Sequence, residues 1–576
     1  MQLYYELCRL AACANGIRRM HWPSLVTRSL RSLPPLLLAV HCFPCASAAG
    51  VDPDPSPRLL EEQRAQAREQ LRRPGAHQLP RLVDHVDLGT DPRQVTEPGP
   101  TLLAANVDVL DNGLMPKSEV EKVLIPFRGI PIGAKRADLL LRRLRAVLVQ
   151  RGLITSHARL IRADVTAKVL VVELLPGRIE TLQVNGAPVA AGTRHALALR
   201  EGDVLQLSDL EQAVEQINRL RVNQAEVHLL PGQTPGSSVV DVRLEQSRPW
   251  QLSLGMDNHG QRGIGAARVR TALAVEDRLG WQESLTLATV NSERSRAWLF
   301  SGALPHGYST YSLTLSGSAY HSPVDAGISQ SGGSRAVAAG WNRVLQRSAA
   351  GKDSVDLTLT RTHADRRVDD VQFAPQILSV ARVGFTRLHR SPDLQTVAEI
   401  AFARGLPLLS ATRDAVDAPA SAPHAQFEKL EAHLHLAVPL GNSGLTYLAQ
   451  ADAQTTTTAL HGQEQLRLGG ASSIRGFAEG ALAGDRGFAL RQELRLAPAA
   501  PPGVVSAQWE HFVLTDLGTA AQVGGTREHL ASIGAGMRLY WPQRGHAELV
   551  LAKPVAWTGA VSEHGWRLHA QLHIEF

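Results

Sequence analysis

From Trp250 to the C-terminus, short segments alternate between apolar and polar residues, with Gly, Asn, Asp and Ser between them. Examples are Ser309–Ser318, Ser354–Thr362 and Lys429–Val438. An apolar period of two is typical of β-strands whose two faces meet different surroundings. About 325 residues, at roughly 20 per strand and turn, predict about 16 strands. We therefore expect residues 249–576 to form a 16-stranded antiparallel transmembrane β-barrel.

The last strand separates this interpretation from its alternative, a soluble β-sandwich. One face is apolar along its whole length and ends at the C-terminus: Trp566, Leu568, Ala570, Leu572, Ile574 and Phe576. The other face is polar: Arg567, His569, Gln571, His573 and Glu575. A strand that divides lipid from a polar lumen shows this pattern, which favours the membrane barrel.

The stretch 466–496 reads LRLGGASSIRGFAEGALAGDRGFALRQELRL and has a glycine-rich middle. Its first half ends in a compact turn, Ser473-Ile474-Arg475-Gly476-Phe477. Its second half alternates as a strand, with Phe488 and Leu494 on an apolar face and Glu493 on a charged face. Taken alone, Arg475 could be a solvated turn residue.

These motifs resemble the closing hairpin of the TpsB family, the outer-membrane transporters of two-partner secretion. The resemblance rests on the SIRGF turn, the Gly484-Asp485-Arg486-Gly487 run and the Glu493-Leu494 pair. Similar segments extend it from about Arg58 to Phe576, and TpsB proteins share a superfamily with the barrel-assembly proteins. The resemblance implies that the turn folds back into the barrel lumen, where its arginine pairs with acids of the inner wall.

Three acids are candidate partners of Arg475. Asp516 comes first, because FVLTDLG resembles the Asp-x-Gly strand that faces the loop tip in the family. Glu493 comes second, since it resembles the neighbouring wall acid. Asp485 lies so close to the hairpin in sequence that we expect it to shape the turn instead.

The region before the barrel contains two α+β units, expected at residues 105–177 and 178–248. In the first, Leu141, Leu144 and Leu148 mark one helical face and Gly152 ends the helix. In the second, INRLRVNQAEVHLLPGQTPGSSVVDV resembles the second polypeptide-transport-associated (POTRA) domain of the TpsB family. The resemblance implies two periplasmic POTRA domains whose free sheet edge and neighbouring helix receive unfolded substrate.

Two segments precede these units. Proline at the start and glycine past the end predict a helix over Pro57–Arg73, within a region of residues 50–75. Its few large apolar residues cannot fill an ordinary core, and the TpsB family carries a pore-plugging helix here; a solvated linker helix is the alternative. Residues 76–104, which are rich in Pro, His and Asp up to about Pro100, are expected to form a flexible tether.

The N-terminus resembles a secretory signal over residues 1–49, and Met20 is a plausible true start. Arg28 and Arg31 precede the apolar run, and small residues follow it. All four cysteines lie in this segment, so the mature chain would contain none. A disulfide scaffold and a thiolate metal site are therefore not expected.

Other function classes find little support. The net charge of +6 is spread along the chain without an aromatic-basic motif, so no nucleic-acid partner is expected. Gly351-Lys352 lacks the glycine and hydroxyl residue of a phosphate-binding loop, and His433 and His435 lack a third ligand. We expect no enzyme, no metal and no cofactor.

The sequence therefore predicts an outer-membrane translocator with its POTRA domains in the periplasm. It would recognise a large unfolded exoprotein, such as a haemolysin, adhesin or contact-dependent toxin, and secrete it through the barrel. The alternative is an assembly factor of the same superfamily that inserts other barrels. Expected partners are the cargo, outer-membrane lipid and the barrel-assembly machinery, which would read Phe576 as a C-terminal insertion signal.

Overall fold

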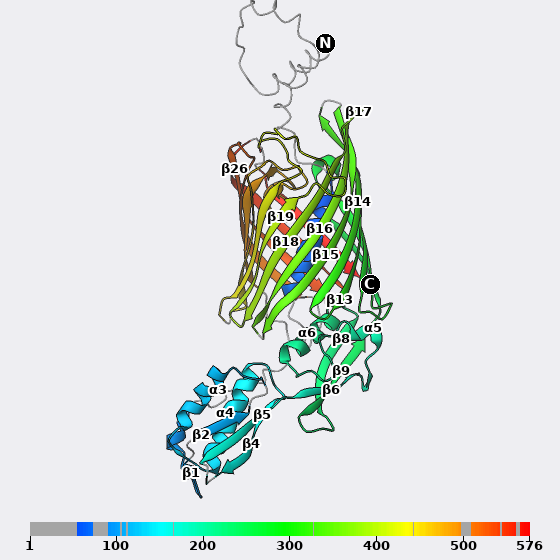
Figure 1. Ribbon diagram of the computed structural model, residues 1–576. Coiled ribbons are helices and arrows are strands. Elements are labelled where there is room, and N and C mark those ends of the chain that lie inside the picture. Colours follow the sequence, from blue (N-terminus) through cyan, green and yellow to red (C-terminus); the bar gives the residue numbers. More distant parts are fainter. Residues whose placement is uncertain are drawn as a thin grey trace, which may run out of the picture. The chain divides into compact units, whose positions relative to one another are not determined.

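The computed structural model describes residues 54–72 and 90–576, apart from short gaps at 104–105, 111–112, 165, 167, 326–327, 349, 442, 497–507, 542–543, 560 and 562–564. The expected signal segment and residues 73–89 of the expected tether lie outside the described residues. Figure 1 shows a barrel of tilted strands preceded by two smaller α+β units.

The barrel contains 16 antiparallel strands, and its first and last strands pair with each other to close it. The strand number and the start at Trp250 agree with the sequence prediction. A two-residue segment, β17 (Val371–Gln372), extends the sheet beside β16. The barrel strands are β10 (Trp250–Asp257), β11 (Arg268–Glu276), β12 (Ser284–Ser292), β13 (Ser295–His306), β14 (Ser309–Asp325), β15 (Ile328–Ser348), β16 (Gly351–Val368), β18 (Gln376–Ser391), β19 (Leu394–Gly405), β20 (Glu428–Pro439), β21 (Leu445–Thr456), β24 (Arg486–Leu496), β25 (Gln508–Ala521), β26 (Arg527–Trp541), β27 (Gly545–Trp557) and β28 (Arg567–Glu575).

The alternation of the sequence becomes an outer apolar face and an inner polar face. Leu568 of β28 and the flanking residues Trp566 and Phe576 are exposed on the outside, whereas His569 of β28 is buried inside. β10 follows the second α+β unit directly, so its first residue marks the periplasmic end of the barrel. Successive strands alternate in direction. The turns at the extracellular end are therefore those that follow β10, β12, β14, β16, β19, β21, β25 and β27.

The first α+β unit has the predicted order of strand, helix, helix, strand and strand. These elements are β2 (Asn106–Leu110), α3 (Lys117–Leu124), α4 (Ala134–Gln150), β4 (His157–Asp164) and β5 (Val169–Leu175), and the sheet order is β2-β5-β4. Leu144 and Leu148 of α4 are fully buried against Val172 and Leu174 of β5. Gly152 ends α4 with a φ of +82°, as its position in the sequence predicted.

The second α+β unit repeats this arrangement with a four-stranded sheet in the order β7-β6-β9-β8. Its elements are β6 (Arg178–Val184), β7 (Ala187–Pro188), α5 (Ala191–Arg194), α6 (Leu207–Asn218), β8 (Asn223–Pro231) and β9 (Ser237–Gln246). β8 is an edge strand, with Leu229 and Leu230 exposed on it. Glu180 of β6 holds the β8–β9 turn by accepting hydrogen bonds from the amides of Gln233 (2.9 Å) and Thr234 (3.3 Å).

The second unit also contacts the periplasmic turns of the barrel. Gln216 of α6 donates a hydrogen bond to the carbonyl of Gly307 (3.0 Å), and Arg219 donates to Ser284 (3.0 Å). Glu215 forms ion pairs with Arg347 and Lys352 at the turn between β15 and β16. These polar contacts hold α6 against the mouth of the barrel.

The expected tether over residues 76–104 is too long at its C-terminal end. Residues 92–94 form a 3₁₀ turn, η2 (Pro92–Gln94), and β1 (Leu102–Leu103) pairs with β3 (Pro131–Ile132). Glu97 accepts hydrogen bonds from the amides of Gly133 (3.1 Å) and Arg136 (2.7 Å) at the start of α4. Those amides have no partner within the helix, so a distant carboxylate caps them and ties this segment to the first unit.

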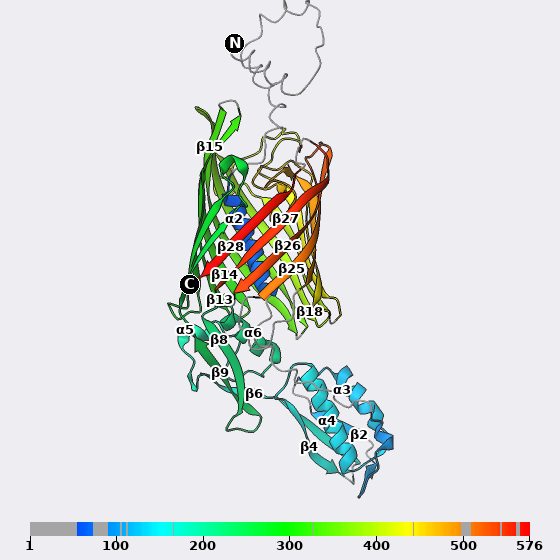
Figure 2. The ribbon, with the colours of Figure 1, turned by 180° about the vertical axis from the view of Figure 1, so that it is seen from behind.

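The helix predicted at Pro57–Arg73 is α2 (Ser56–Arg72). It lies inside the barrel, where it contacts β13, β14 and β19 (Figure 2). Among the described residues, no helix has the length and apolar character needed to cross a membrane.

Candidate functional site in the barrel lumen

The SIRGF turn lies in the long connection between β21 and β24, which also contains a small hairpin of β22 (Leu466–Leu468) and β23 (Leu482–Gly484). Ile474 and Phe477 are fully buried in an apolar cluster with Leu468, Ala520 and Leu530. This extracellular connection therefore folds against the inner wall and is anchored by hydrophobic packing on either side of Arg475.

Gly476 allows the turn to approach the wall closely. A Cβ atom at this position would lie 2.6 Å from the Cβ of Ser532 and 2.9 Å from the carbonyl carbon of Lys553. Any larger residue would push the turn away from β26 and β27. Ser473 stabilises the turn from the other side, because its hydroxyl accepts a hydrogen bond from the Gly469 amide (2.8 Å).

Arg475 is 1% exposed and forms a bidentate ion pair with Asp516 of β25. Its Nε and Nη2 atoms donate to the two carboxylate oxygens at 2.8 and 2.7 Å. The Arg475 amide also donates to Asp516 (3.0 Å), and Nη1 donates to Glu493 of β24. The structure thus places the first two acids of the sequence ranking against this guanidinium.

Asp485 lies elsewhere. It is fully buried and accepts hydrogen bonds from the amides of Leu460 (2.9 Å) and Val523 (2.7 Å) and from the Gln465 side chain (3.0 Å). These contacts join the start of the connection to the turn after β25. Among the described residues, Asp485 has no ion pair with Arg475, in keeping with the turn-shaping position expected for it.

Glu493 carries more charge partners than the sequence suggested. Arg538 of β26 donates to both of its oxygens at 3.1 and 3.2 Å, and Arg495 donates at 2.7 Å. Phe512 lies under Arg538, with its ring centre 4.2 Å from the guanidinium carbon. Arg538 was missed from the sequence because its partner is on a strand that is distant along the chain.

His569 is a second residue that sequence reasoning did not single out as a contact of the turn. Its ring Nε2 lies 2.5 Å from the carbonyl oxygen of Arg475, where it acts as the donor. His569 belongs to β28, the strand that closes the barrel against β10. Arg475 by itself therefore connects the turn to three strands, β24, β25 and β28.

A second cluster of buried charges lies on a different part of the inner wall. Arg382 of β18 forms ion pairs with Asp356 (3.0 Å), Glu399 and Glu431 (2.9 Å). Lys429 extends the cluster to Glu431 (2.9 Å) and Glu464 (2.8 Å). Beside it, His433 is within 2.5 Å of Asp452, so this histidine has a carboxylate partner in the lumen.

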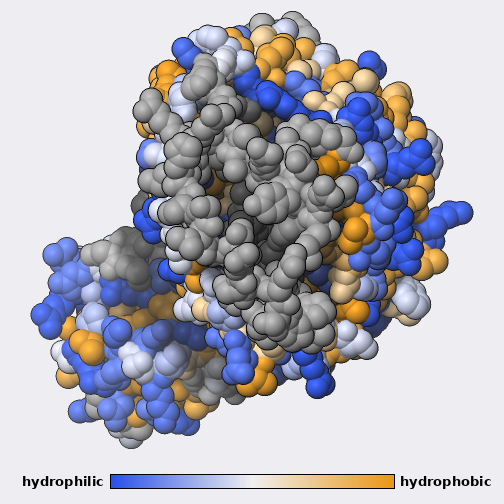
Figure 3. All heavy atoms as spheres, turned by 90° about the horizontal axis from the view of Figure 1, so that it is seen from above, coloured by the Kyte–Doolittle hydropathy of each residue, from blue (hydrophilic) through white to orange (hydrophobic). Residues whose placement is uncertain are grey.

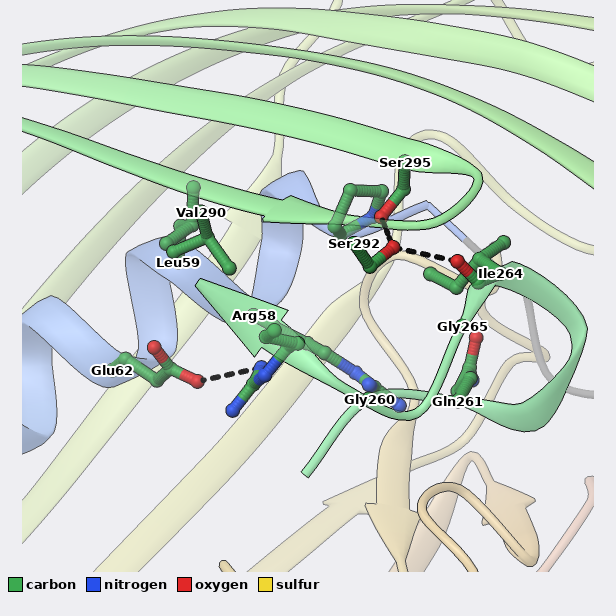
Figure 4. A pocket seen from close by; sticks show the side chains of 12 residues that line it. Arg58, Leu59, Glu62, Gly260, Gln261, Ile264, Gly265, Val290, Ser292 and Ser295 are labelled. Carbon is green, nitrogen blue, oxygen red and sulfur yellow. Dashed lines mark hydrogen bonds and ion pairs between the residues drawn. The ribbon is translucent and has the colours of Figure 1, made fainter. Parts of the chain in front are cut away.

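The helix α2 is held in the lumen mainly by polar contacts. Glu62 accepts two hydrogen bonds from Arg270 of β11, at 2.7 and 3.0 Å. Arg58 lies 3.4 Å from Glu479 of the loop connection, and Arg68 lies 3.7 Å from Glu399. Arg58 and Glu62 also line a small cavity between α2 and the turn after β10 (Figure 4). Leu59 and Leu60 add apolar contacts with a small cluster of Val290, Ala297 and Leu299.

Phe576, the expected insertion signal, ends the seam between the first and last strands. Its amide donates a hydrogen bond to the carbonyl of Leu252 (2.9 Å), and its side chain is exposed on the outer face. Among the described residues, no group of three or more His, Cys, Asp or Glu side chains is arranged to hold a metal ion.

Comparisons with known proteins agree with this architecture. A profile of the haemolysin secretion/activation protein family ShlB/FhaC/HecB matches residues 236–539, and a POTRA domain profile matches residues 178–231. The outer membrane transporter CdiB of Escherichia coli O6:K15:H31 (strain 536 / UPEC) is 30% identical over 425 residues, covering 68% of this chain and 71% of the relative. CdiB of Dickeya dadantii (strain 3937) is 30% identical over 357 residues, which cover 60% of this chain and 63% of the relative.

Two solved structures share the fold. CdiB from Escherichia coli has a TM-score of 0.80 at 24% identity, covering 90% of this chain and 97% of the other. CdiB from Acinetobacter baumannii has a TM-score of 0.72 at 18% identity, with the same coverage. The chain therefore belongs to the haemolysin secretion/activation protein family ShlB/FhaC/HecB, the TpsB outer-membrane transporters, with its barrel in the outer membrane and its POTRA domains in the periplasm.

Proposed function

We propose that this protein binds one large exoprotein in an unfolded state through its POTRA domains and secretes it through the barrel. The relatives include proteins named outer membrane transporter CdiB and hemolysin transporter protein ShlB. The proposed cargo is accordingly a haemolysin, an adhesin or a contact-dependent toxin. Folding of the cargo outside the cell would make passage irreversible, so transport requires neither nucleotide nor a catalytic step by this chain.

The observation that carries the proposal is the way α2 occupies the lumen. Its contacts are mostly ion pairs and hydrogen bonds, such as Glu62 with Arg270 and Gln63 with Thr314 (3.3 Å). Such groups can exchange protein partners for water when the helix leaves, at a small net cost in free energy. A helix packed by a large apolar face would not leave so readily. We propose that α2 is a removable plug.

The POTRA domains supply the proposed receptor. β8 is an edge strand of its sheet, and an edge strand offers unpaired amides and carbonyls to an extended chain irrespective of most of its sequence. The helix α6, which packs against β8, contacts the barrel turns through Gln216 and Arg219. Cargo bound at β8 would therefore start close to the pore.

For biogenesis, we propose that the barrel-assembly machinery recognises β28 with its terminal Phe576. The exposed apolar residues on the outer face of this strand support that role.

The test of the proposed function is secretion of a large candidate exoprotein, chosen from the genes that neighbour the gene of this protein. Both are expressed in a host without its own two-partner transporter, and cargo is measured in the medium. A variant without residues 179–244 should insert its barrel but leave the cargo in the periplasm. Normal cargo release by that variant would exclude the receptor role. Loss of other outer-membrane barrels in a strain without this protein would instead indicate an assembly factor.

A further inference from the structure

The outer face of β13, β14, β15 and β16 carries a group of basic residues near one end of the barrel. We call it the outer arginine surface and define it by Arg296, Arg335, Arg361, Arg367 and His363. The register of the strands brings these residues together, although they come from three strands separated by up to 71 positions in sequence. Asp365 is an acidic member of the same surface and lies 3.3 Å from His363.

The pairing fixes which face these side chains occupy. Ser316 and Ser318 of β14 face the lumen, where they meet Ser56 and Asp54 beside α2. The intervening odd-numbered residues of β14 therefore point outward. Gly317 pairs with both Trp298 and Arg335, and Arg335 pairs with His363.

The same pairing gives the position of the surface along the barrel. The lowest row of the surface contains Arg361, which stands opposite Val337 in the same row as Phe300 and Leu315. Below that row the outward residues are apolar, including Leu313, Leu357 and Leu359. An arginine facing lipid costs about 2–4 kcal/mol at the bilayer midplane and about 0–1 kcal/mol near the interface. The surface thus marks the upper limit of the apolar band.

This limit is at the extracellular leaflet. The turn between β12 and β13, which directly precedes Arg296, is an extracellular turn, because β10 starts at the periplasmic end and successive strands alternate in direction. In the view from above, polar and hydrophobic residues both reach the outer rim of the barrel (Figure 3).

Two of the arginines are available to a ligand. Arg361 donates to the carbonyl of Leu409 (2.8 Å), and Arg367 donates to Gln372 (3.2 Å). Arg296 and Arg335 are exposed, and neither guanidinium group has a hydrogen bond or ion pair with a residue that the structure describes. They lie two strands and two residues apart, which places their Cα atoms roughly 12 Å from each other.

The strand positions between these two arginines carry small residues. These are Gly317, Ala319 and Gly333. A Cβ atom at Gly317 would lie 2.6 Å from Nε1 of Trp298, so the indole ring lies directly on this glycine. The site thus combines the Trp298 ring at the level of the lipid headgroups with the cations of Arg296 and Arg335, which lie above an apolar wall. Such a combination suits an amphipathic anion.

We infer that the outer arginine surface binds the phosphorylated headgroup of an outer-leaflet glycolipid, with Arg296 and Arg335 as the phosphate contacts. Guanidinium groups bind phosphate oxygens in a bidentate manner, and the acyl chains would lie along Leu313 and Val337 below. The charge, the depth and the apolar wall match a membrane lipid better than a soluble anion, since a soluble anion would gain nothing from that wall.

The test measures binding of lipid A to the full-length protein in detergent by native mass spectrometry. The variant Arg296→Gln/Arg335→Gln should bind diphosphorylated lipid A about 30-fold more weakly, since each arginine near a charged membrane surface contributes roughly a factor of five. Arg387→Gln is the matched control, because Arg387 is an exposed outward arginine at the opposite, periplasmic end of β18. It should bind as the unaltered protein does.

A second measurement needs no variant. Lipid A without its phosphates should bind to the unaltered protein at least about 30-fold more weakly than the diphosphorylated form. Equal binding of the two lipids, or equal binding by the double variant, would overturn the inference. Displacement of diphosphorylated lipid A by the same concentration of inorganic phosphate would also overturn it, because the site would then bind any anion. Heat-modifiable mobility on gels verifies that each variant is folded.

Discussion

Asp516 accepts three hydrogen bonds from Arg475, two from the guanidinium at 2.8 and 2.7 Å and one from the amide at 3.0 Å. Both the side chain and the backbone of the turn are thus tied to one carboxylate of β25. Both residues are buried, so neither charge has water as an alternative partner. Removing one member of a buried ion pair costs about 3–5 kcal/mol, because the other charge stays unpaired.

Arg475→Ala should therefore release the turn from the wall and reduce secretion at least about tenfold without preventing barrel insertion. Asp516→Ala should have nearly the same effect, and Arg475→Lys should restore only part of the secretion, because lysine cannot form the bidentate pair. Secreted cargo is the measurement. Arg486→Ala, an exposed arginine on β24, is the control. If the losses of Arg475→Ala and Asp516→Ala simply multiply in the double variant, the two side chains do not act together.

The position of α2 can be tested with one charge. Glu62→Lys would place a cation beside Arg270 and Arg268, at a cost of about 2 kcal/mol or more, which is a factor of about 30 in the population of the plugged state. We expect higher conductance in planar bilayers, with secretion retained. Glu61→Lys is the matched control, since the side chain of Glu61 is exposed on the same helix. Unaltered conductance of Glu62→Lys would show that α2 does not limit the pore.

Arg382 should contribute to the stability of the barrel itself. Arg382→Met leaves Asp356, Glu399 and Glu431 without their shared cation, so the barrel should lose about 3–5 kcal/mol of unfolding free energy. The temperature at which the folded form disappears on gels measures this loss. Arg387→Met on the outer face of the same strand should leave that temperature unchanged. Equal temperatures for both variants would contradict a stabilising role for the cluster.

The free edge of β8 should contact the cargo through Leu229 and Leu230, which are exposed in the structure. Replacing both with serine should weaken binding of an unfolded cargo segment about tenfold, because two partly exposed leucines lose their apolar burial in the complex. Binding is followed by fluorescence of a labelled cargo peptide. Leu279→Ser, an exposed leucine in a periplasmic turn of the barrel, should bind normally. An equal loss in both variants would place the contact elsewhere.

The β8–β9 turn should depend on pH through Glu180. Hydrogen bonds from Ser237 and from the amide of Thr234 lower the pKa of this carboxyl below its ordinary value. A lowered pKa stabilises the folded state above the unfolded pKa, and this contribution is lost as pH falls through the folded pKa. The amides of Gln233 and Thr234 should therefore lose protection from hydrogen exchange below about pH 4. Glu180→Gln should show low protection already at pH 7; strong, pH-independent protection in both proteins would refute this account.

Local sequence pattern was sufficient for much of the fold, because strand alternation, helix punctuation and turn residues act over a few positions. The apolar face of β28 indicated lipid on one side, and Pro57 marked the start of α2 to within one residue. The pairing of Arg475 with Asp516 was ranked first through a family resemblance. Alternation alone indicated only that each of them faces the polar side.

The tertiary structure decided which charges share the lumen. Arg538 reaches Glu493 from 45 positions away, and His569 reaches Arg475 from 94, because barrel closure and strand register bring distant residues to one height. Register also assembled the outer arginine surface from strands that look ordinary in sequence. The sequence likewise missed the capping of α4 by Glu97, since only the packed unit places that carboxylate at the free amides of the helix. Local periodicity determines which side chains of a strand point into the lumen and which point outward. Which of these side chains meet across strands depends on the register of the closed barrel.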